Sequence, residues 1–207
     1  MDCGPDFRQQ MLQNDITKVD AILMTHEHND HMIGLDDVRP FNFMLKQDLP
    51  VYAVPRVQTQ LKIRFDYIFQ TINRYPGAPM IKLNTIDKAQ AFEVFGIPIQ
   101  AIEVMHGKLP VLGFRIGNFA YITDMKTIAE EEFAKLAGVE HLIINALHHH
   151  PHHAHMNLEE AIAFAQRAGA KATYLTHASH RMGLYADVQA ELPEGIYLAW
   201  DGLQVSL

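Results

Sequence analysis

The feature that most constrains this chain is a histidine-rich loop, THEHNDH at residues 25–31, directly after a compact apolar run at residues 19–24. Such a run followed by polar residues is typical of a buried strand and the loop at its end. His26 and His28 lie two residues apart, so in extended backbone they project to the same side and can hold one metal ion. After the chain turns, Asp30 and His31 can face a second ion. Nitrogen and oxygen ligands of this kind favour Zn²⁺, Mn²⁺ or Fe.

The composition is that of a folded, acidic protein. The chain has 207 residues, of which 48% are hydrophobic and 20% charged, a balance that excludes a disordered or collagen-like chain. Its length predicts a single domain over residues 1–207. Lys and Arg number 17 against 24 Asp and Glu, a formal net charge of −7. We therefore expect no broad basic surface and no stable nucleic-acid partner.

Cysteine and histidine usage point away from disulfides and toward metal. Cys3 is the only cysteine, which excludes an intrachain disulfide framework and a cysteine-rich zinc site and fits a reducing compartment. No apolar run approaches the ~20 residues that span a membrane, and the first residues lack a signal-peptide pattern. We expect a cytoplasmic protein with no membrane partner. Of the 13 histidines, seven fall between residues 141 and 155 and three between residues 26 and 31, which indicates metal binding.

Short apolar runs predict a protein that is rich in strands. They cover residues 19–24, 51–54, 91–95, 97–105, 112–116, 119–123, 141–145, 173–176, 197–200 and 203–205. Two helices are predicted from capping boxes, Thr127 with Glu130 and Asn157 with Glu160, and glycines at positions 138 and 169 mark their ends. The second helix has one apolar stripe that would lie on a sheet. The fold class expected is α/β (α+β), with helices outside two sheets in an αββα sandwich, although periodicity alone does not fix that topology.

Further motifs occur in the order in which they occur in the metallo-β-lactamase superfamily, which this sequence resembles. The H-x-H-x-D-H loop has the spacing of that family's defining loop, and Asp2-Cys3-Gly4 resembles the end of the strand before it. His106 matches the family's third histidine, Asp124 the aspartate that bridges both ions, and His177 the last ligand. The resemblance implies an αββα metallo-β-lactamase sandwich with two divalent ions per chain. One ion would take His26, His28, His106 and Asp124, and the other Asp30, His31, Asp124 and His177.

Two positions refine this resemblance. True lactamases of this fold use cysteine on the second ion where this chain has Asp124, which argues against antibiotic hydrolysis and for the phosphodiesterase and general hydrolase branches. Asp2 is interpreted as a carboxylate that orients a ligating histidine, although as the second residue it could also be frayed.

Relatives begin with an opening hairpin before this point, so the chain looks N-terminally truncated. One sheet would then have an unpaired edge, which favours self-association into a homo-oligomer.

The finer resemblance is to the phosphoribosyl cyclic phosphodiesterase (PhnP-like) branch, with ribonuclease Z as a more distant relative. The segments GLDDVRPF at 34–41, HHAHMNLEEA at 152–161 and LTHASHRMG at 175–183 carry it. It implies that His155 lies over the metals and meets the phosphate or the leaving oxygen, so His155, with the ligand Asp30, is our catalytic candidate. Arg39 and His180 are candidates for clamping the phosphate. Arg39 could instead pair with Asp36 or Asp37, and His180 could serve packing or support.

The function expected is hydrolysis of a small, cyclic phosphodiester by a hydroxide held between two Mn²⁺ or Zn²⁺ ions, with His155 protonating the leaving alkoxide. One alternative is hydrolysis of another ester, such as a lactone or thioester, at the same centre. A nuclease that processes tRNA is another, weakened by the acidic charge. A third alternative is not an enzyme but a metal-binding module, in which the histidines of residues 148–155 buffer Zn²⁺ or Ni²⁺.

Overall fold

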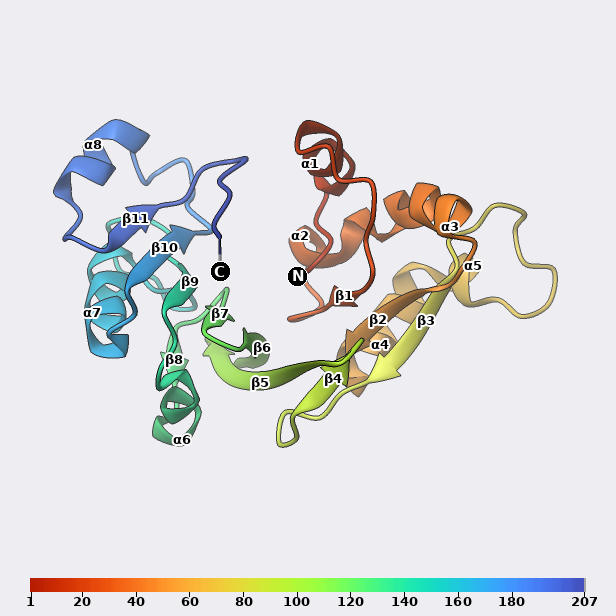
Figure 1. Cartoon of the computed structure of the whole chain (residues 1–207), viewed down its shortest axis with the longest axis horizontal. Coiled ribbons are helices and arrows are strands. Elements are labelled where there is room, and N and C mark those ends of the chain that lie inside the picture. Colours follow the sequence, from red (N-terminus) through yellow and green to blue (C-terminus); the bar gives the residue numbers. More distant parts are fainter. Residues whose placement is uncertain (207) are drawn as a thin grey trace. The chain divides into compact units, whose positions relative to one another are not determined.

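The computed structural model describes residues 1–206, and the chain divides into two compact units, Met1–Asp87 and Lys88–Leu207 (Figure 1). Each unit has its own sheet and its own hydrophobic core. The longest helix described, α7, has 11 residues, and no helix within residues 1–206 has the length and apolarity that crossing a membrane requires.

The first unit is a small parallel sheet surrounded by short helices. Its strands are β1 (Ile22–Leu23), β2 (Leu49–Ala53) and β3 (Ile81–Thr85), which pair in parallel in the order β1-β2-β3. Its helices are α1 (Phe7–Gln13), α2 (Asn29–Met32), the 3-10 helix η1 (Ile33–Val38), α3 (Arg39–Leu45), α4 (Pro55–Arg64) and α5 (Asp66–Phe69). Proline occupies the first turns of α3 and α4, where its missing N–H costs no hydrogen bond.

One core holds the helices of the first unit on its sheet. Val51 and Ala53 of β2 are fully buried together with Leu61 of α4 and Leu35 of η1. β2 alternates between buried and half-buried residues, as expected when one face of a strand meets a core. The packed sheet and helices thus fix the end of β1, where the histidine-rich loop begins.

The second unit contains an eight-stranded mixed sheet. Its strands are β4 (Phe92–Val94), β5 (Ile97–His106), β6 (Leu109–Ile116), β7 (Phe119–Tyr121), β8 (Thr127–Ile128), β9 (His141–Asn145), β10 (Ala172–Thr176) and β11 (Ile196–Leu198). The order is β11-β10-β9-β7-β6-β5-β4, and β8 pairs with β5. β4 to β7 are antiparallel neighbours, whereas β7, β9, β10 and β11 are parallel. Its helices are α6 (Glu130–Phe133), the 3-10 helix η2 (Ala134–Leu136), α7 (Leu158–Ala168) and α8 (Tyr185–Glu191).

Helix α7 packs on this sheet through the apolar stripe predicted from the sequence (Figure 1). Ala161 and Ala165 of α7 are buried in one cluster with Leu142 and Ile144 of β9 and Leu175 of β10. Small alanines let the helix approach the sheet closely, and the branched strand residues fill the space between them. This packing fixes the parallel strands whose ends carry the candidate site.

The element predictions succeed best in the second unit. β9 and α7 form as predicted, and the α7 capping box is present: the Asn157 side chain accepts from the Glu160 N–H at 2.9 Å, and the Asn157 N–H donates to Glu160 Oε2 at 2.9 Å. The other capping box is wrong, because Thr127 lies in β8 and α6 begins at Glu130 without a side-chain cap. Residues 203–205 form no strand, and β3 and the helices of the first unit were not predicted.

Candidate metal centre

The histidine-rich loop of the first unit begins directly after β1 and holds its first two histidines close together. His26 is fully buried, and its Nδ1 lies 2.9 Å from the Thr25 hydroxyl. This contact occupies Nδ1 and leaves the other ring nitrogen, Nε2, as the atom that could bind a metal ion. That Nε2 lies 3.0 Å from Nδ1 of His28. Two ring nitrogens so close can share a proton, or they can converge on one cation, as the sequence pattern predicts.

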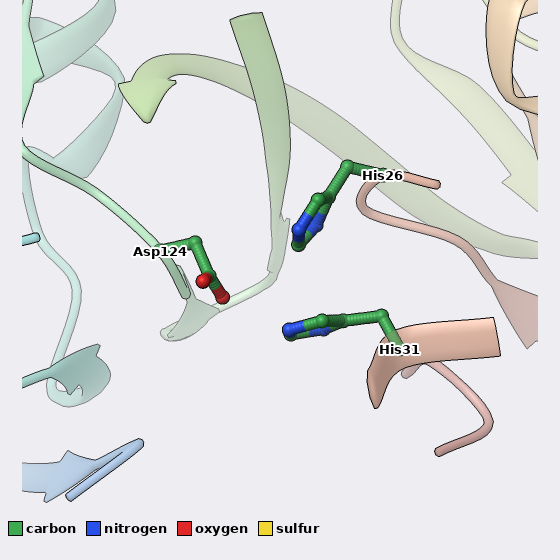
Figure 2. A group of neighbouring side chains, drawn as sticks. All are labelled: His26, His31 and Asp124. Atoms are coloured by element: carbon green, nitrogen blue, oxygen red, sulfur yellow. The ribbon is translucent and has the colours of Figure 1, made fainter. Parts of the chain in front are cut away.

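Asp30 and His31 form the other half of the loop, on the helical turn α2. Figure 2 shows the imidazole of His31 on this turn and that of His26 on the loop before it, and their ring centroids are 4.2 Å apart. His31 Nε2 lies 3.4 Å from Asp30 Oδ2. His31 is buried, whereas the Asp30 side chain is 60% exposed and can move toward a ligand.

Asp2 holds this loop in place, as interpreted from the sequence. Its Oδ2 lies 2.9 Å from His31 Nδ1 and accepts from the Thr25 hydroxyl at 2.9 Å, and its Oδ1 accepts from the Thr25 N–H at 2.8 Å. The Asp2 side chain is 8% exposed, so it is not frayed. A carboxylate on Nδ1 fixes the histidine tautomer and directs Nε2 toward a metal ion.

Two glycines allow the chain around Asp2 to lie against the loop. A Cβ at Gly34 would meet the Gly4 carbonyl oxygen at 2.0 Å, and a Cβ at Gly4 would meet the Asp30 carbonyl oxygen at 2.5 Å. The backbone N–H of Cys3 donates to the His31 carbonyl at 2.7 Å. Only glycine permits this approach, which explains the glycines of DCG and of the segment after the loop.

In the second unit, strand direction brings the remaining candidates to one edge of the sheet. β5 runs antiparallel to β6, and β6 antiparallel to β7, so β5 ends at the same edge as the parallel strands β7, β9 and β10. His106 is the last residue of β5, Asp124 follows β7, and His177 directly follows β10. The loop after β9 carries the second histidine cluster. Carboxyl ends of strands are the usual place for such sites.

These side chains converge around the Asp124 carboxylate, which is also drawn in Figure 2. Its Oδ1 lies 3.3 Å from His177 Nε2 and 3.5 Å from His155 Nδ1. One possible ligand atom each from His106, Asp124 and His155 lies within 4.8 Å of the others. The Ala154 carbonyl lies 2.9 Å from His106 Nδ1, which leaves His106 Nε2 as the atom that could bind a metal ion.

Asp124 and His177 have strained backbones. Their φ angles are 55° and 57°, in the left-handed region that residues other than glycine rarely adopt. Asp124 is held there from both sides. The Thr123 hydroxyl donates to its Oδ2 at 2.7 Å, and Asn145 of β9 bonds both the N–H and the carbonyl of the next residue, Met125, at 2.7 and 3.0 Å. Strain that the surroundings enforce is typical of functional sites.

His155 is half-buried beside Asp124, and within residues 1–206 its buried Nδ1 makes no hydrogen bond. The pKa of His155 is lowered to about 4, mainly by burial; Asp124 opposes this shift, and the neighbouring His177 and His106 add to it. An imidazole nitrogen that is buried and makes no hydrogen bond within the described residues fits a site that binds a further group. The donor set, imidazole with carboxylate, suits a divalent transition metal.

Two other histidines of this tract make hydrogen bonds with the backbone. His152 Nδ1 accepts from the backbone N–H groups of Ala154 and His155 at 3.2 Å each, and His149 Nε2 donates to the Met182 carbonyl at 2.8 Å. These contacts shape the loop that presents His155. Sequence reasoning missed this support, as it missed Thr25, Thr123 and Asn145. The signal for Asn145 is an amide that ends an otherwise apolar strand, LIIN.

The two candidates for clamping phosphate lie differently from each other. Arg39 begins α3, is 41% exposed, and pairs with Asp36 at 3.0 Å, which was its alternative interpretation. The Tyr67 hydroxyl also donates to Asp36. His180 is exposed on the loop after β10. Neither belongs to the groups of side chains described above.

The comparisons with known proteins show the family of the chain. Residues 1–178 match the family model of the β-lactamase superfamily domain. A solved diphosphatase of the PhnP family is 37% identical, with a TM-score of 0.90, over 100% of this chain and 78% of that one. The chain therefore belongs to the β-lactamase superfamily and, within it, to the PhnP family of metallo-β-lactamase-fold hydrolases. The α/β fold class predicted from the sequence and the recognised superfamily are thus confirmed.

Two further similarities widen the comparison. Zn²⁺-bound PqqB from Methylobacterium extorquens shares the fold at 20% identity, with a TM-score of 0.78, over 100% of this chain and 82% of that one. An octanoyltransferase from Porphyromonas gingivalis is 40% identical over 205 residues, which is 99% of this chain but 41% of that protein. The chain thus spans about two fifths of the length of this curated relative.

Proposed function

We propose that this protein is a phosphodiesterase that binds two divalent metal ions, Mn²⁺ or Zn²⁺, and hydrolyses a small phosphodiester. The ligands proposed are the residues that match the superfamily motifs: His26, His28, Asp30, His31, His106, Asp124 and His177. The observation that carries the proposal is the grouping of His106, at the end of β5, with Asp124 and His155, in the loops after β7 and β9, in a PhnP-family chain. Aspartate at position 124, where lactamases have cysteine, supports phosphodiester substrates over antibiotics.

The protein's own residues orient these ligands before any ion binds. Two divalent ions held by these residues would supply an activated water molecule and would neutralise charge on the phosphate oxygens. Asp2 and the Ala154 carbonyl fix the tautomers of His31 and His106, so that each presents Nε2. Thr123 and Asn145 hold Asp124 in its left-handed backbone conformation. Such supporting contacts reduce the reorganisation that metal binding would otherwise require.

His155 is proposed to donate a proton or a hydrogen bond to the leaving oxygen. It lies beside Asp124 and His177, and its Nδ1 has no other hydrogen-bonding role within the described residues. Its position also fits a metal ligand, because it groups with His106 and Asp124. The two roles differ in their consequences: loss of a ligand lowers metal content, whereas loss of a proton donor lowers turnover at full metal content.

The test uses two phosphodiesters with different leaving groups. p-Nitrophenolate leaves without protonation, whereas the alkoxide of a cyclic ribose phosphate needs a proton. With Mn²⁺ or Zn²⁺ we expect turnover of both bis(p-nitrophenyl) phosphate and a cyclic ribose phosphate, and loss of both in His26→Ala. His155→Ala should lower turnover of the ribose ester by about 10²–10⁴-fold, and that of the nitrophenyl ester less. Full activity of His26→Ala would refute the proposal.

A second candidate is hydrolysis of another ester, such as a thioester. It is favoured by the similarity to a protein named for octanoyl transfer, although 41% coverage means that most of that protein lies outside the match. A cysteine nucleophile in this chain is not a route to such chemistry. Cys3 is buried, and burial raises the pKa of its thiol to about 12, so no thiolate forms near neutral pH. Octanoyl thioesters and lactones therefore belong in the same substrate panel.

The alternative that the protein is a metal-buffering module, and not an enzyme, predicts a different number of bound ions and a different affinity for them. Buffering by the tract at residues 148–155 predicts several weakly bound ions and no turnover. The contacts of His149 and His152 with backbone groups favour a structured loop over an open chelating tract. Desalting followed by metal analysis distinguishes the two, because tightly held ions survive desalting and weakly held ions do not.

A further inference from the structure

The loop between β9 and α7 carries His155 and depends on side chains for its conformation. Its two ends are tied together, because the Leu147 N–H donates to the Met156 carbonyl at 3.0 Å. Between them, the backbone groups of residues 149–155 make no hydrogen bond with any other backbone group of the described chain. Side chains must therefore provide the hydrogen bonds that fix this segment.

The imidazole of His152 provides two of these hydrogen bonds. Its Nδ1 accepts from the N–H groups of Ala154 and His155, two and three residues further along the chain, at 3.2 Å each. A side chain that accepts from these two positions acts as a helix N-cap does and holds the chain in one turn. Burial, followed by the neighbouring His153, lowers the pKa of His152. The ring is therefore neutral near neutral pH, and Nδ1 keeps the lone pair that accepts these bonds.

The turn held by His152 carries two groups of the candidate metal centre. The Ala154 carbonyl lies 2.9 Å from His106 Nδ1, and the ring centroids of His155 and His106 are 4.4 Å apart. His155 Nδ1 also lies 3.5 Å from Asp124 Oδ1. One turn thus places both the carbonyl that fixes the tautomer of His106 and the ring of His155.

We infer that His152 is a positioning residue of the metal centre, which acts through the turn at Ala154 and His155. The inference rests on the proposed function, because it takes His106 as a metal ligand and His155 as the proton donor. It adds that a single acceptor atom, His152 Nδ1, orients both of them. His152 therefore serves the architecture of the site, although it touches neither the metal ions nor the substrate.

Asparagine separates the role of Nδ1 from that of the whole imidazole. The rings of His152 and His155 are close, with centroids 5.1 Å apart, so the ring itself also has to be tested. Asparagine Oδ1 is bonded to Cγ, as Nδ1 is in histidine, and asparagine is among the residues most favoured for accepting from such N–H groups. His152→Asn thus keeps the acceptor and removes Nε2, whereas His152→Ala removes both. The matched control is His150→Ala, which removes an exposed imidazole of the same loop.

Zinc affinity is a readout that does not depend on turnover. Each desalted protein competes with a chromophoric chelator for Zn²⁺. His152→Ala should bind Zn²⁺ about 10-fold more weakly, as expected when the support of a metal-binding histidine is lost. His152→Asn and His150→Ala should bind as the wild-type protein does. Equal losses in His152→Asn and His152→Ala would overturn the inference, since the imidazole itself would then be required. Wild-type affinity in His152→Ala would also overturn it. Should His152→Ala not fold, a 10-fold loss in His152→Asn overturns the inference and wild-type affinity in it supports Nδ1 as the acting atom.

Turnover at saturating metal separates the inference from the proposed function. His152→Ala should lower kcat for a cyclic ribose phosphate by about 10- to 100-fold with little change in KM, because the proton donor His155 is displaced. Bis(p-nitrophenyl) phosphate, whose leaving group needs no proton, should be affected less, and His152→Asn should restore kcat. Equal losses on both esters would overturn the positioning of His155. No turnover of either ester by the wild-type protein would contradict the proposed function, and the zinc affinities would still test the role of His152.

Discussion

Asp2→Asn tests how the loop of the first unit is prepared for metal. In the wild-type protein the carboxylate accepts three hydrogen bonds, two from Thr25 and one from His31 Nδ1. Asparagine has nearly the same shape, and its oxygen can still accept from the Thr25 N–H. Its NH₂ group, however, then faces the Thr25 hydroxyl and His31 Nδ1. His31 Nδ1 must become an acceptor, which moves the ring proton to Nε2, the proposed metal ligand atom.

The expected cost follows from this tautomer change. Loss of a carboxylate that orients a metal-binding histidine weakens metal affinity by about 10- to 100-fold, which corresponds to about 1.4–2.8 kcal/mol of binding free energy. The affinity is measured by competition between the desalted protein and a chromophoric chelator for Zn²⁺. Asp6→Asn is the matched control, because Asp6 is an exposed carboxylate nearby that makes no side-chain cap on α1. Wild-type affinity in Asp2→Asn would refute the proposed orientation of His31.

Three further outcomes follow from the structure. Since burial raises the pKa of Cys3 to about 12, iodoacetamide at pH 8 should modify it only after urea unfolds the protein; rapid labelling of the native protein would contradict its burial. Asn157→Ala removes the cap of α7 and should lower the free energy of unfolding by about 1 kcal/mol in urea titrations. An unchanged free energy of unfolding would show that the cap does not stabilise the protein. Burial raises the pKa of Glu160, but hydrogen bonds from Lys126 and the Asn157 backbone outweigh it, so the pKa is lowered from 4.5. Glu160→Gln should therefore destabilise the protein at pH 7, and its deficit should shrink as the pH falls below 4.5; a deficit independent of pH would contradict this.

The second unit was predictable where local signals and tertiary contacts agree. His141–Asn145 is an apolar run in the middle of a sheet, and Asn157 with Glu160 caps a helix whose stripe meets that sheet. The capping box at Thr127 fails because the antiparallel pairing of Met105 with Thr127 extends the sheet there. The strand pairing outweighs the local capping signal, because Thr127 is β-branched and is readily accommodated in a strand.

The first unit was harder to predict because its helices are short. Pro55 after Val54 is the start signal for α4, but the polar residues between its buried positions weaken the apolar period. The loop after β1 was recognised because its ligand spacing is a local property of the sequence. The supports of the site were not recognised, since the contacts of Asn145 with Met125 and of Ala154 with His106 join residues far apart in the sequence. Only the fold reveals them.

The metal content of the protein tests the central claim most directly. The full chain is saturated with Zn²⁺ or Mn²⁺, desalted and analysed for metal per chain, beside Asp124→Asn and the control Asp6→Asn. We predict two ions per chain in the wild-type protein and the control, and fewer in Asp124→Asn, because the Asp124 carboxylate is one of the proposed ligands. Less than one ion in the wild-type protein, or undiminished metal in Asp124→Asn, would contradict the account.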